Sequence, residues 1–381
     1  MKLSYNQLRD QGCVILAPAI RLHPSLKTLD IGFNFVGDIG CEAIATSLRE
    51  NAILETLYLG GNQIRESGAR QLAFAAKSEC NIACLHLTAN EIGPQGMIAL
   101  SSSIKERILL DDVSRRCVSF DPLKNSNPCR FALSCDPPVS NLFMRDLYLG
   151  GTAMGSEGCA AISKMILSHN HLRLICLANN RLQDIDLILL SNSFSENKPL
   201  HLVKLDLSFN NFTCTGVEAL MNSVWGAPNL REIKIDNNKI KDRGAQLAAV
   251  LTTSVDLEVL DLGFNLISSC GVKTLMKAIA DSSTIKSLTL SGNALDTHSA
   301  KSTSFALALN RSLQQIYLDH CSIAFTAQRH ITAGIVSNKQ SSLNTLTGFS
   351  LGGKFLIHRE RECHFKLCST SSGPNNFQRQ L

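Results

Sequence analysis

An asparagine that recurs at a nearly constant interval constrains this chain more than any other feature of its sequence. In the stretch Leu257–Asn265, apolar residues stand eight, five and three positions before the asparagine. The same pattern ends at Asn34, Asn62, Asn90, Asn180, Asn210, Asn238 and Asn293. Thr152 and Cys321 end two more copies, and Asn6 ends a truncated one. These residues, termed the ladder positions, follow one another in steps of 28, apart from single steps of 62, 30 and 27. Such an interval indicates a repeat architecture.

Each repeat has a second half that begins with a glycine six residues after the ladder position. Apolar residues at helical spacing follow it, as Ile44 and Leu48 follow Gly40. Each repeat is therefore predicted to form a short strand, an asparagine turn, a loop and a helix. The glycines are Gly12, Gly40, Gly68, Gly96, Gly158, Gly216, Gly244 and Gly271. The repeats of Asn180, Asn293 and Cys321 have Asp186, Ser299 and Ala327 instead.

One such repeat is too small to bury its own apolar residues, so neighbouring repeats must share a continuous core. The asparagine side chain carries both a donor and an acceptor, and it can satisfy backbone groups where the chain leaves the strand. Strands pair at about 4.8 Å, whereas helix axes need about 8–10 Å. A stack of these repeats is therefore predicted to bend into a horseshoe with a parallel sheet on its concave face and helices on its convex face.

The pattern of leucines, asparagine or cysteine, glycine and helix resembles the leucine-rich repeat of the ribonuclease-inhibitor type. Proteins with this repeat include ribonuclease inhibitor, the Ran GTPase-activating protein and the sensor arms of nucleotide-binding immune receptors. The resemblance implies an α/β leucine-rich-repeat solenoid. It does not identify a partner.

The repeats predict one domain over residues 1–351, of about ten to eleven repeats, interrupted by an irregular insertion at about 106–141. The insertion holds four of the ten prolines, which favours a loop. It is either a functional projection or an unselected loop, including retained intronic sequence. Residues 352–381 are predicted to be a disordered tail. Met1 falls inside the first strand with no cap before it, so we expect further sequence upstream; a first repeat that frays is the alternative.

Composition favours an intracellular, cytoplasmic protein. The chain has 14 cysteines, but the spaced pairs of a disulfide framework or zinc site are absent. Cys13, Cys41 and Cys159 each follow a repeat glycine, where a small buried residue is expected. Neither a signal peptide nor a membrane-spanning apolar run is evident. The net charge of +5 comes from scattered residues, which favours a solvated surface over a nucleic-acid site.

No catalytic motif is found in the chain, and we expect a protein without enzymatic activity, cofactor or metal. Gly60-Gly61 and Gly150-Gly151 lie at ladder turns and lack the residues of a phosphate-binding loop, so they are interpreted as tight turns. Phe33, Phe209 and Phe264 each precede a ladder asparagine and are predicted to pack against each other or the strand ends.

Residues six, four and two positions before each ladder position are predicted to point away from the core, onto the concave sheet. Three of the four tyrosines fall four positions before, and tyrosine is favoured at protein interfaces. An ordinary solvated sheet face is the alternative. The line four positions before also includes Cys176 and Thr289, and the line six before includes Asp146 and Lys204. The candidate partner-binding residues are Asp30, Tyr58, His86, Tyr148, Asp206, Glu232, Lys234, Asp236, Asp261, Tyr317 and Asp319.

The favoured hypothesis is a non-enzymatic interaction scaffold that binds an unidentified protein on the concave face, with no small-molecule substrate, nucleic acid or membrane. It could be the recognition arm of a longer receptor-like chain. The resemblance also implies an alternative, a GTPase-activating protein for a Ran-like small GTPase, although that family typically has an acidic tail and this tail is basic. A nuclease inhibitor is a third hypothesis, which the charge balance disfavours.

Overall fold

The computed structural model describes residues 1–77, 80–118, 144–168, 171–196, 201–225, 227–348 and 355–356. Its contacts divide the chain into two units, Met1–Leu230 and Arg231–Leu381, termed unit 1 and unit 2. Each unit is described by itself.

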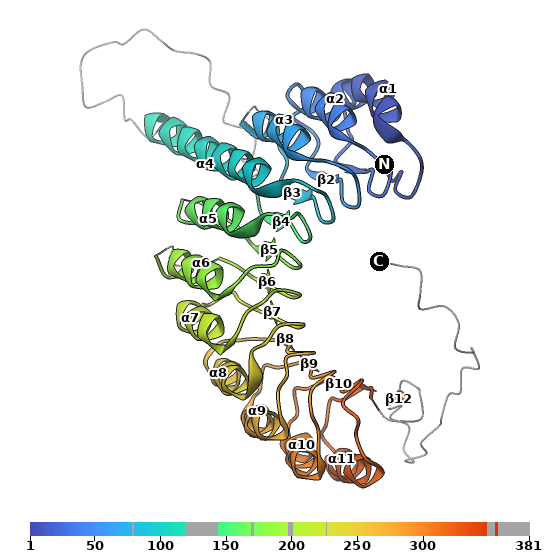
Figure 1. The fold of residues 1–381 in the computed structure, drawn as a ribbon, viewed down its shortest axis with the longest axis vertical. Helices are drawn as coiled ribbons and strands as arrows, with labels where there is room; N and C mark the ends of the chain where they lie inside the picture. The colour runs from blue at the N-terminus through green and yellow to red at the C-terminus, as the bar shows by residue number, and fades with distance from the viewer. Residues whose placement is uncertain are drawn as a thin grey trace. The chain divides into compact units, whose positions relative to one another are not determined.

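Unit 1 alternates short strands with helices. Each strand pairs in parallel with the next one along the chain, and the register aligns equivalent repeat positions, as in Leu29↔Leu57↔Leu85. Its strands are β1 (Thr28–Asp30), β2 (Thr56–Tyr58), β3 (Cys84–His86), β4 (Asp146–Tyr148), β5 (Leu174–Cys176) and β6 (Lys204–Asp206). Its helices are α1 (Arg9–Leu22), α2 (Asp38–Leu48), α3 (Glu66–Lys77), α4 (Gly93–Val118), α5 (Gly155–Ile166), α6 (Asp184–Glu196) and α7 (Cys214–Val224). The helices form one layer and the strands the other (Figure 1).

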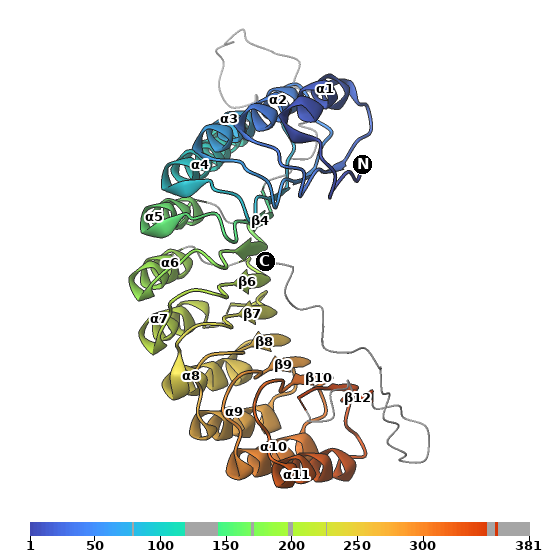
Figure 2. The same cartoon turned by 45° about the vertical axis from the view of Figure 1, so that its right-hand side comes forward.

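Unit 2 repeats this arrangement, and its helices again lie together on one side of its strands (Figure 2). Strands β7 to β11 pair in parallel, each with the next along the chain, and β12 pairs antiparallel with β11. The strands are β7 (Glu232–Lys234), β8 (Val259–Asp261), β9 (Ser287–Thr289), β10 (Gln315–Tyr317), β11 (Thr345–Leu346) and β12 (Phe355–Leu356). The helices are α8 (Lys241–Ser254), α9 (Ser269–Asp281), α10 (Thr297–Leu309) and α11 (Phe325–Ser337).

The core of each unit lies between its two layers. In the repeat of Asn62, the apolar residues Leu54, Leu57 and Leu59 are all 0% exposed, and Leu72 of α3 is 4% exposed. The predicted alternation of strand and helix around a shared core is therefore confirmed, and the fold is an α/β leucine-rich-repeat solenoid. Burial of these side chains is the main source of its stability.

Seven of the ladder asparagines, Asn34, Asn62, Asn90, Asn180, Asn210, Asn265 and Asn293, donate from Nδ2 to a backbone carbonyl of the preceding repeat. The Nδ2 of Asn62 donates to Leu59 O at 2.8 Å and, in the preceding repeat, to Ile31 O at 3.1 Å. Its Oδ1 accepts from the backbone N–H of Asn34 at 2.9 Å and of Val36 at 3.1 Å. One buried side chain thus satisfies four backbone groups that the short strands leave unpaired.

The substituted ladder positions make fewer of these bonds. Thr152 Oγ1 donates to Leu149 O at 2.9 Å and lies 3.2 Å from Asn180 Oδ1, but makes no bond to the preceding repeat. Cys321 Sγ reaches Leu290 O of the preceding repeat at 3.3 Å, as a weak donor.

At four of the eight recurring glycines, Gly40, Gly68, Gly216 and Gly271, the missing Cβ makes room for a carboxylate from the preceding repeat. Asp38 Oδ1 accepts from the backbone N–H of Arg65 at 2.8 Å and of Gly68 at 2.9 Å, where α3 begins. A Cβ on Gly68 would lie 2.7 Å from that oxygen, which is too close. Asp10 Oδ1 accepts from the backbone N–H of Gly40 in the same way. Each of these aspartates therefore caps the helix of the repeat that follows it.

The segment expected to be an irregular insertion begins as a helix, because α4 continues past Glu106 as far as Val118. Residues 119–143 lie outside the described part of the chain, and the boundaries of the domain and insertion remain predictions. Within the segment expected to be a disordered tail, Phe355–Leu356 forms β12. The other residues after 348 lie outside the described part.

Two smaller predictions concern glycines and cysteines. Gly61 and Gly151 have φ of +67° and +63°, which confirms the tight turns. Cys13, Cys41 and Cys159 are buried free thiols. Burial, with a smaller effect of Asp10, raises the pKa of Cys13 to about 11, so this thiol is unreactive at neutral pH.

Candidate functional site

The strand face of unit 1, which is the side of its sheet turned away from the helices, carries the candidate residues of the first six strands. In β2, Leu57 is buried between Thr56 and Tyr58, both partly exposed, and most other strands alternate in the same way. The register then places six side chains in one line across the sheet, namely Asp30, Tyr58, His86, Tyr148, Cys176 and Asp206. The predicted alignment is present, but a partner-binding role for these residues remains a prediction.

Three rings in this line form a continuous stack, termed the aromatic stack. The centroids of Tyr58 and His86 are 4.1 Å apart with an interplanar angle of 24°. Those of His86 and Tyr148 are 3.7 Å apart with an angle of 13°. Neighbouring parallel strands are spaced at about 4.8 Å, so aromatic residues at one repeat position meet face to face.

The stack is uncharged at neutral pH. Burial lowers the pKa of His86 to about 4, and the nearby Asp30 carboxylate opposes this only in part. Burial, with the Cys84 thiol as a smaller cause, raises the pKa of Tyr148 to about 12 and raises that of Tyr58. The rings therefore present a rigid, neutral and partly exposed surface.

Carboxylates surround the aromatic stack. Asp30 lies beside Tyr58 in the register, and Asp146 precedes Tyr148 by two residues on β4. At the other end of the line, Asp206 Oδ1 accepts from Ser208 N at 3.0 Å, and Cys176 Sγ lies 3.5 Å from Asp206 Oδ2. The surface combines aromatic rings with negative charge.

The strand face of unit 2 carries the remaining candidate residues, and it is mainly polar. Lys234 Nζ pairs with Glu232 Oε1 at 3.0 Å, and Tyr317 donates to Gln315 Oε1 at 3.2 Å. Thr347 donates its hydroxyl to Asp319. The register aligns Lys234, Asp261, Thr289 and Tyr317, and Asp236 lies two residues beyond Lys234. The structure describes no aromatic stack here, because Tyr317 has Thr289 as its neighbour in the register.

On the strand face of unit 2, burial has the largest effect on the pKa of Asp261. It raises the pKa of Asp261 to about 6, and the Asp236 carboxylate adds to the effect. A hydrogen bond from Gly263 N at 3.0 Å and the Lys234 ammonium act in the opposite direction. Asp261 is therefore partly protonated in mildly acidic solution.

A second exposed aromatic group, which was not predicted from the sequence, lies at the loops of the first two repeats. Tyr5 stacks on Phe33 with centroids 4.5 Å apart, and both residues precede a ladder asparagine. Phe33 also covers Gly61, where an added Cβ would lie 2.4 Å from its ring. Phe33, Phe209 and Phe264 are 48%, 55% and 43% exposed. Phe33 packs on Tyr5 and Gly61, and Phe264 packs on Gly292 and His320, all at the same position of their repeats, next to the turn where a strand ends.

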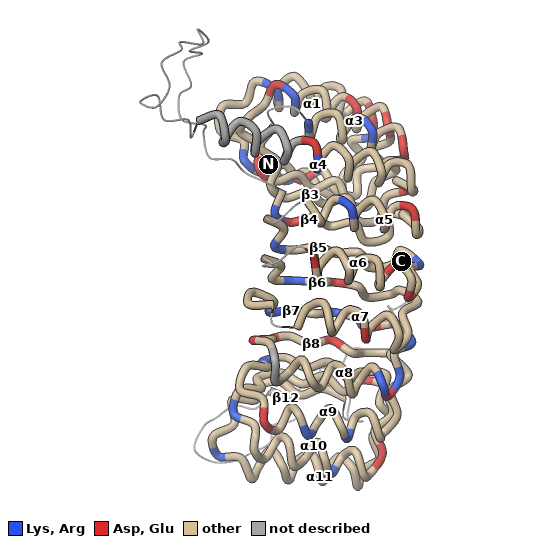
Figure 3. Tube along the Cα trace, turned by 90° about the vertical axis from the view of Figure 1, so that its left-hand side faces the viewer, with Lys and Arg blue, Asp and Glu red and all other residues tan. Residues whose placement is uncertain are grey.

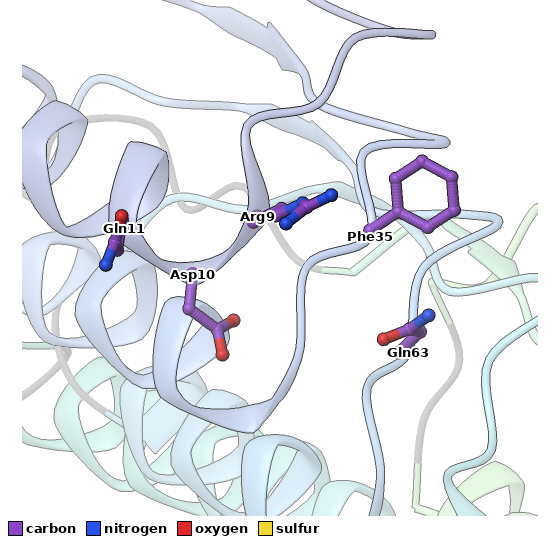
Figure 4. A pocket seen from close by; sticks show the side chains of 5 residues that line it. All are labelled: Arg9, Asp10, Gln11, Phe35 and Gln63. Atoms are coloured by element: carbon purple, nitrogen blue, oxygen red, sulfur yellow. The ribbon is translucent and has the colours of Figure 1, made fainter.

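An open hollow of about 530 Å³ lies next to these loops, lined by Arg9, Asp10, Gln11, Phe35 and Gln63 (Figure 4). Asp10 already caps α2 through Gly37 N and Gly40 N, at 2.7 and 3.0 Å. This carboxylate has a structural role, and the hollow does not bring together an acid, a base and a nucleophile.

The described part of the chain gives little support for a metal site or a membrane-spanning segment. No three His, Cys, Asp or Glu side chains gather there as a metal site would require. Among the described helices, none combines the length and apolarity needed to span a membrane. On the side of the repeats seen in Figure 3, basic and acidic residues are interspersed.

Comparisons with known proteins agree with the repeat. The leucine rich repeat family matches residues 23–45, 80–101 and 198–221. The human NACHT, LRR and PYD domains-containing protein 14 is 25% identical over 218 residues, covering 56% of this chain and 20% of that protein. Pig ribonuclease inhibitor is 24% identical over 212 residues, covering 55% of this chain and 46% of the inhibitor. The aligned part of this chain thus spans less than half the length of either relative.

Among solved structures, an internalin from Listeria monocytogenes is similar with a TM-score of 0.36 and 16% identity, covering 85% of this chain and 93% of the internalin.

Proposed function

Since the chain is a leucine-rich-repeat protein of the ribonuclease-inhibitor type, we propose that it is a non-enzymatic interaction module that binds a partner protein on its strand faces. Proteins of this family are typically binding modules without enzymatic activity. In unit 1 the aromatic stack is the main anchor, and in unit 2 Tyr317 and the neighbouring charged residues add contacts.

The aromatic stack is the observation that carries this proposal. Interface hot spots are enriched in large aromatic side chains that are already held in one conformation, because little side-chain entropy is lost when the partner binds. Here each tyrosine ring packs against His86, so the stack is held before any partner arrives. A solvated sheet face has no need for three stacked rings.

The charged residues of the two faces supply specificity. Asp30, Asp146 and Asp206 surround the stack in unit 1, and Asp236 and Asp261 lie close to Lys234 in unit 2. Charges at an interface mainly guide association and exclude partners of the wrong charge. We therefore expect binding to weaken at high salt.

Affinity capture from cell extracts tests the proposal. We expect the wild-type chain to capture a partner, and the Tyr58→Ala/Tyr148→Ala double variant to lose most of it, because alanine removes the anchor rings. Tyr317→Ala alone is expected to have a smaller effect. Ribonucleases and a panel of small GTPases are included as defined partners, because ribonuclease inhibitors are among the relatives and the alternative function predicts GTPase stimulation.

Phe74→Ala is the matched control. Phe74 is an aromatic residue of α3, 52% exposed, whose ring lies 4.4 Å from the Arg49 guanidinium on the helix side. Its removal is expected to leave capture unchanged. Equal capture by the wild type and the double tyrosine variant would refute the chosen surface.

A further inference from the structure

The outer face of the Tyr148 ring is the part of the aromatic stack best suited to a specific ligand group. We propose that this ring face and the Asp206 carboxylate together bind an arginine side chain presented by the partner protein. The inference rests on the proposed function, since it names the chemistry of the group that the strand face of unit 1 receives.

The geometry of the stack leaves this ring face available. One face of Tyr148 is covered by His86 on β3, at 3.7 Å between centroids. The opposite face turns toward β5, the next strand in the sheet, whose residue in register with Tyr148 is Cys176. A thiol is much smaller than a ring, so the line of rings ends at Tyr148, and Cys176 is followed in the line by the Asp206 carboxylate on β6.

The carboxylate on the far side of Cys176 can accept further hydrogen bonds. Asp206 Oδ1 accepts from Ser208 N at 3.0 Å, and its Oδ2 is approached by the Cys176 thiol at 3.5 Å, which is a weak donor. Each carboxylate oxygen can accept two bonds. Asp146 adds negative charge two residues before Tyr148, and the structure describes no hydrogen bond or ion pair of its carboxylate.

The distance between ring and carboxylate suits a flat cation. Tyr148 and Asp206 stand two strands apart, roughly 9–10 Å between backbones, with the small Cys176 side chain between them. A guanidinium is planar, stacks on aromatic faces and donates in a fork that fits a carboxylate. An ammonium is more strongly hydrated and has no flat face, so lysine fits this place less well.

The local charges favour a cation. At neutral pH the stack carries no charge of its own, because burial holds the pKa of His86 at about 4 and that of Tyr148 at about 12. Lys204 precedes Asp206 on β6 and aligns with Leu174 rather than with Cys176. The backbone position of Lys204 is therefore beside this place and not within it.

Fluorine NMR on the full chain tests the inference without the natural partner. All four tyrosines, Tyr5, Tyr58, Tyr148 and Tyr317, are replaced with 3-fluorotyrosine and assigned from single Tyr→Phe variants. The probe is acetyl-Gly-Arg-Gly-amide, titrated at constant ionic strength. Its uncharged isostere with citrulline and its lysine analogue are titrated in parallel. We expect the arginine peptide to give a saturable shift of the Tyr148 resonance. The lysine peptide is expected to bind at least about fivefold more weakly, and the citrulline peptide is expected to give no shift.

Two variants with the same change of charge complete the experiment. Asp206→Asn keeps an oxygen that can accept from Ser208 N, so the fold is retained, and it is expected to weaken arginine binding about tenfold. Glu42→Gln removes an exposed charge on α2 of the same unit and is expected to leave binding unchanged.

The inference is refuted if the Tyr148 resonance does not move, if the citrulline peptide moves it equally, or if Tyr58 responds in its place. Such a result is separate from failure of the proposed function. Loss of a captured partner in the Tyr58→Ala/Tyr148→Ala variant would still support binding on the strand face, by a group other than arginine.

Discussion

Single residues at the ladder positions decide how tightly neighbouring repeats are joined. A ladder asparagine such as Asn62 makes four backbone hydrogen bonds, and three of its partners, Asn34 N, Val36 N and Ile31 O, belong to the preceding repeat. A threonine has one hydroxyl and cannot donate and accept across the same span. Thr152 is accordingly a weak point in the ladder of unit 1.

Thr152→Asn is therefore predicted to stabilise the protein. The new amide would donate to Leu87 O and accept from Asn90 N, as Asn62 does with the equivalent groups of its preceding repeat, Ile31 O and Asn34 N. We expect a gain of about 1 kcal/mol, typical of satisfying buried backbone groups. Urea unfolding at pH 7 measures it, with Thr152→Val as the control that removes the hydroxyl and loses stability. An asparagine variant no more stable than the wild type would contradict the prediction.

The titration of His86 links the aromatic stack to the stability of the fold. Its pKa is lowered by burial to about 4 from 6.5, so between these values the folded state binds fewer protons than the unfolded state. The contribution of His86 to stability is therefore complete above pH 6.5 and is lost as the pH falls toward 4.

His86→Phe keeps a ring in the stack and removes this titration. We expect the wild type to lose about 1–2 kcal/mol relative to the variant between pH 7 and pH 4.5, less than the full shift implies because the ring is partly exposed. Thermal unfolding at the two pH values provides the measurement. Parallel pH dependence of the two proteins would show that His86 is not held neutral by burial.

At the scale of the secondary-structure elements, helices are capped by the repeat that precedes them. Asp10, Asp38, Asp184 and Asp242 each accept backbone N–H groups at the beginning of the following helix. At Gly40, Gly68, Gly216 and Gly271 the glycine is needed because the carboxylate occupies the space where its Cβ would lie. The sequence analysis identified the glycine but not its reason, since the contact joins residues about one repeat apart.

Asp38→Ala is predicted to destabilise unit 1 by about 1 kcal/mol, the usual effect of losing a helix cap. The loss leaves Arg65 N and Gly68 N without this acceptor. Asp38→Asn, which retains an acceptor oxygen, should lose about half as much or less. Chemical denaturation of the three proteins measures both effects, and an alanine variant as stable as the wild type would contradict the cap.

At the scale of the whole molecule, each repeat of the array is stabilised mainly by its contacts with the repeats next to it. Within each unit, the described helices pack with their neighbours along the chain, and each strand pairs with the next. Stability in such an array is close to a sum of repeat and neighbour contributions. A defect in one repeat should therefore be felt most strongly in the repeats beside it.

Asn62→Ala provides such a defect, because it removes four buried hydrogen bonds and is expected to cost about 3 kcal/mol. Hydrogen exchange followed by mass spectrometry should show faster exchange in β1 to β3 and in α2 and α3, with unit 2 unchanged. A uniform loss of protection along the chain would instead indicate one cooperative unit.

How much could be predicted from the sequence differs between the fold and the site. The spacing of leucines and asparagines predicted every strand from Thr28–Asp30 to Gln315–Tyr317, because burial repeats with a fixed period. It also predicted the line of Asp30, Tyr58, His86 and Tyr148, since strand residues alternate between two faces. It did not predict that α4 would continue to Val118, because the prolines that favoured a loop begin only at Pro122.

By itself the sequence determined the repeat, the parallel pairing and the residues on each face, because these depend only on local period and burial. The tertiary structure decided what the aligned residues do to one another. It closed Tyr58, His86 and Tyr148 into a stack, lowered the pKa of His86, and placed Asp38 against Gly68. Each of these effects depends on distances of a few ångströms between residues that lie a full repeat or more apart in the chain, and such distances exist only once the repeats have packed.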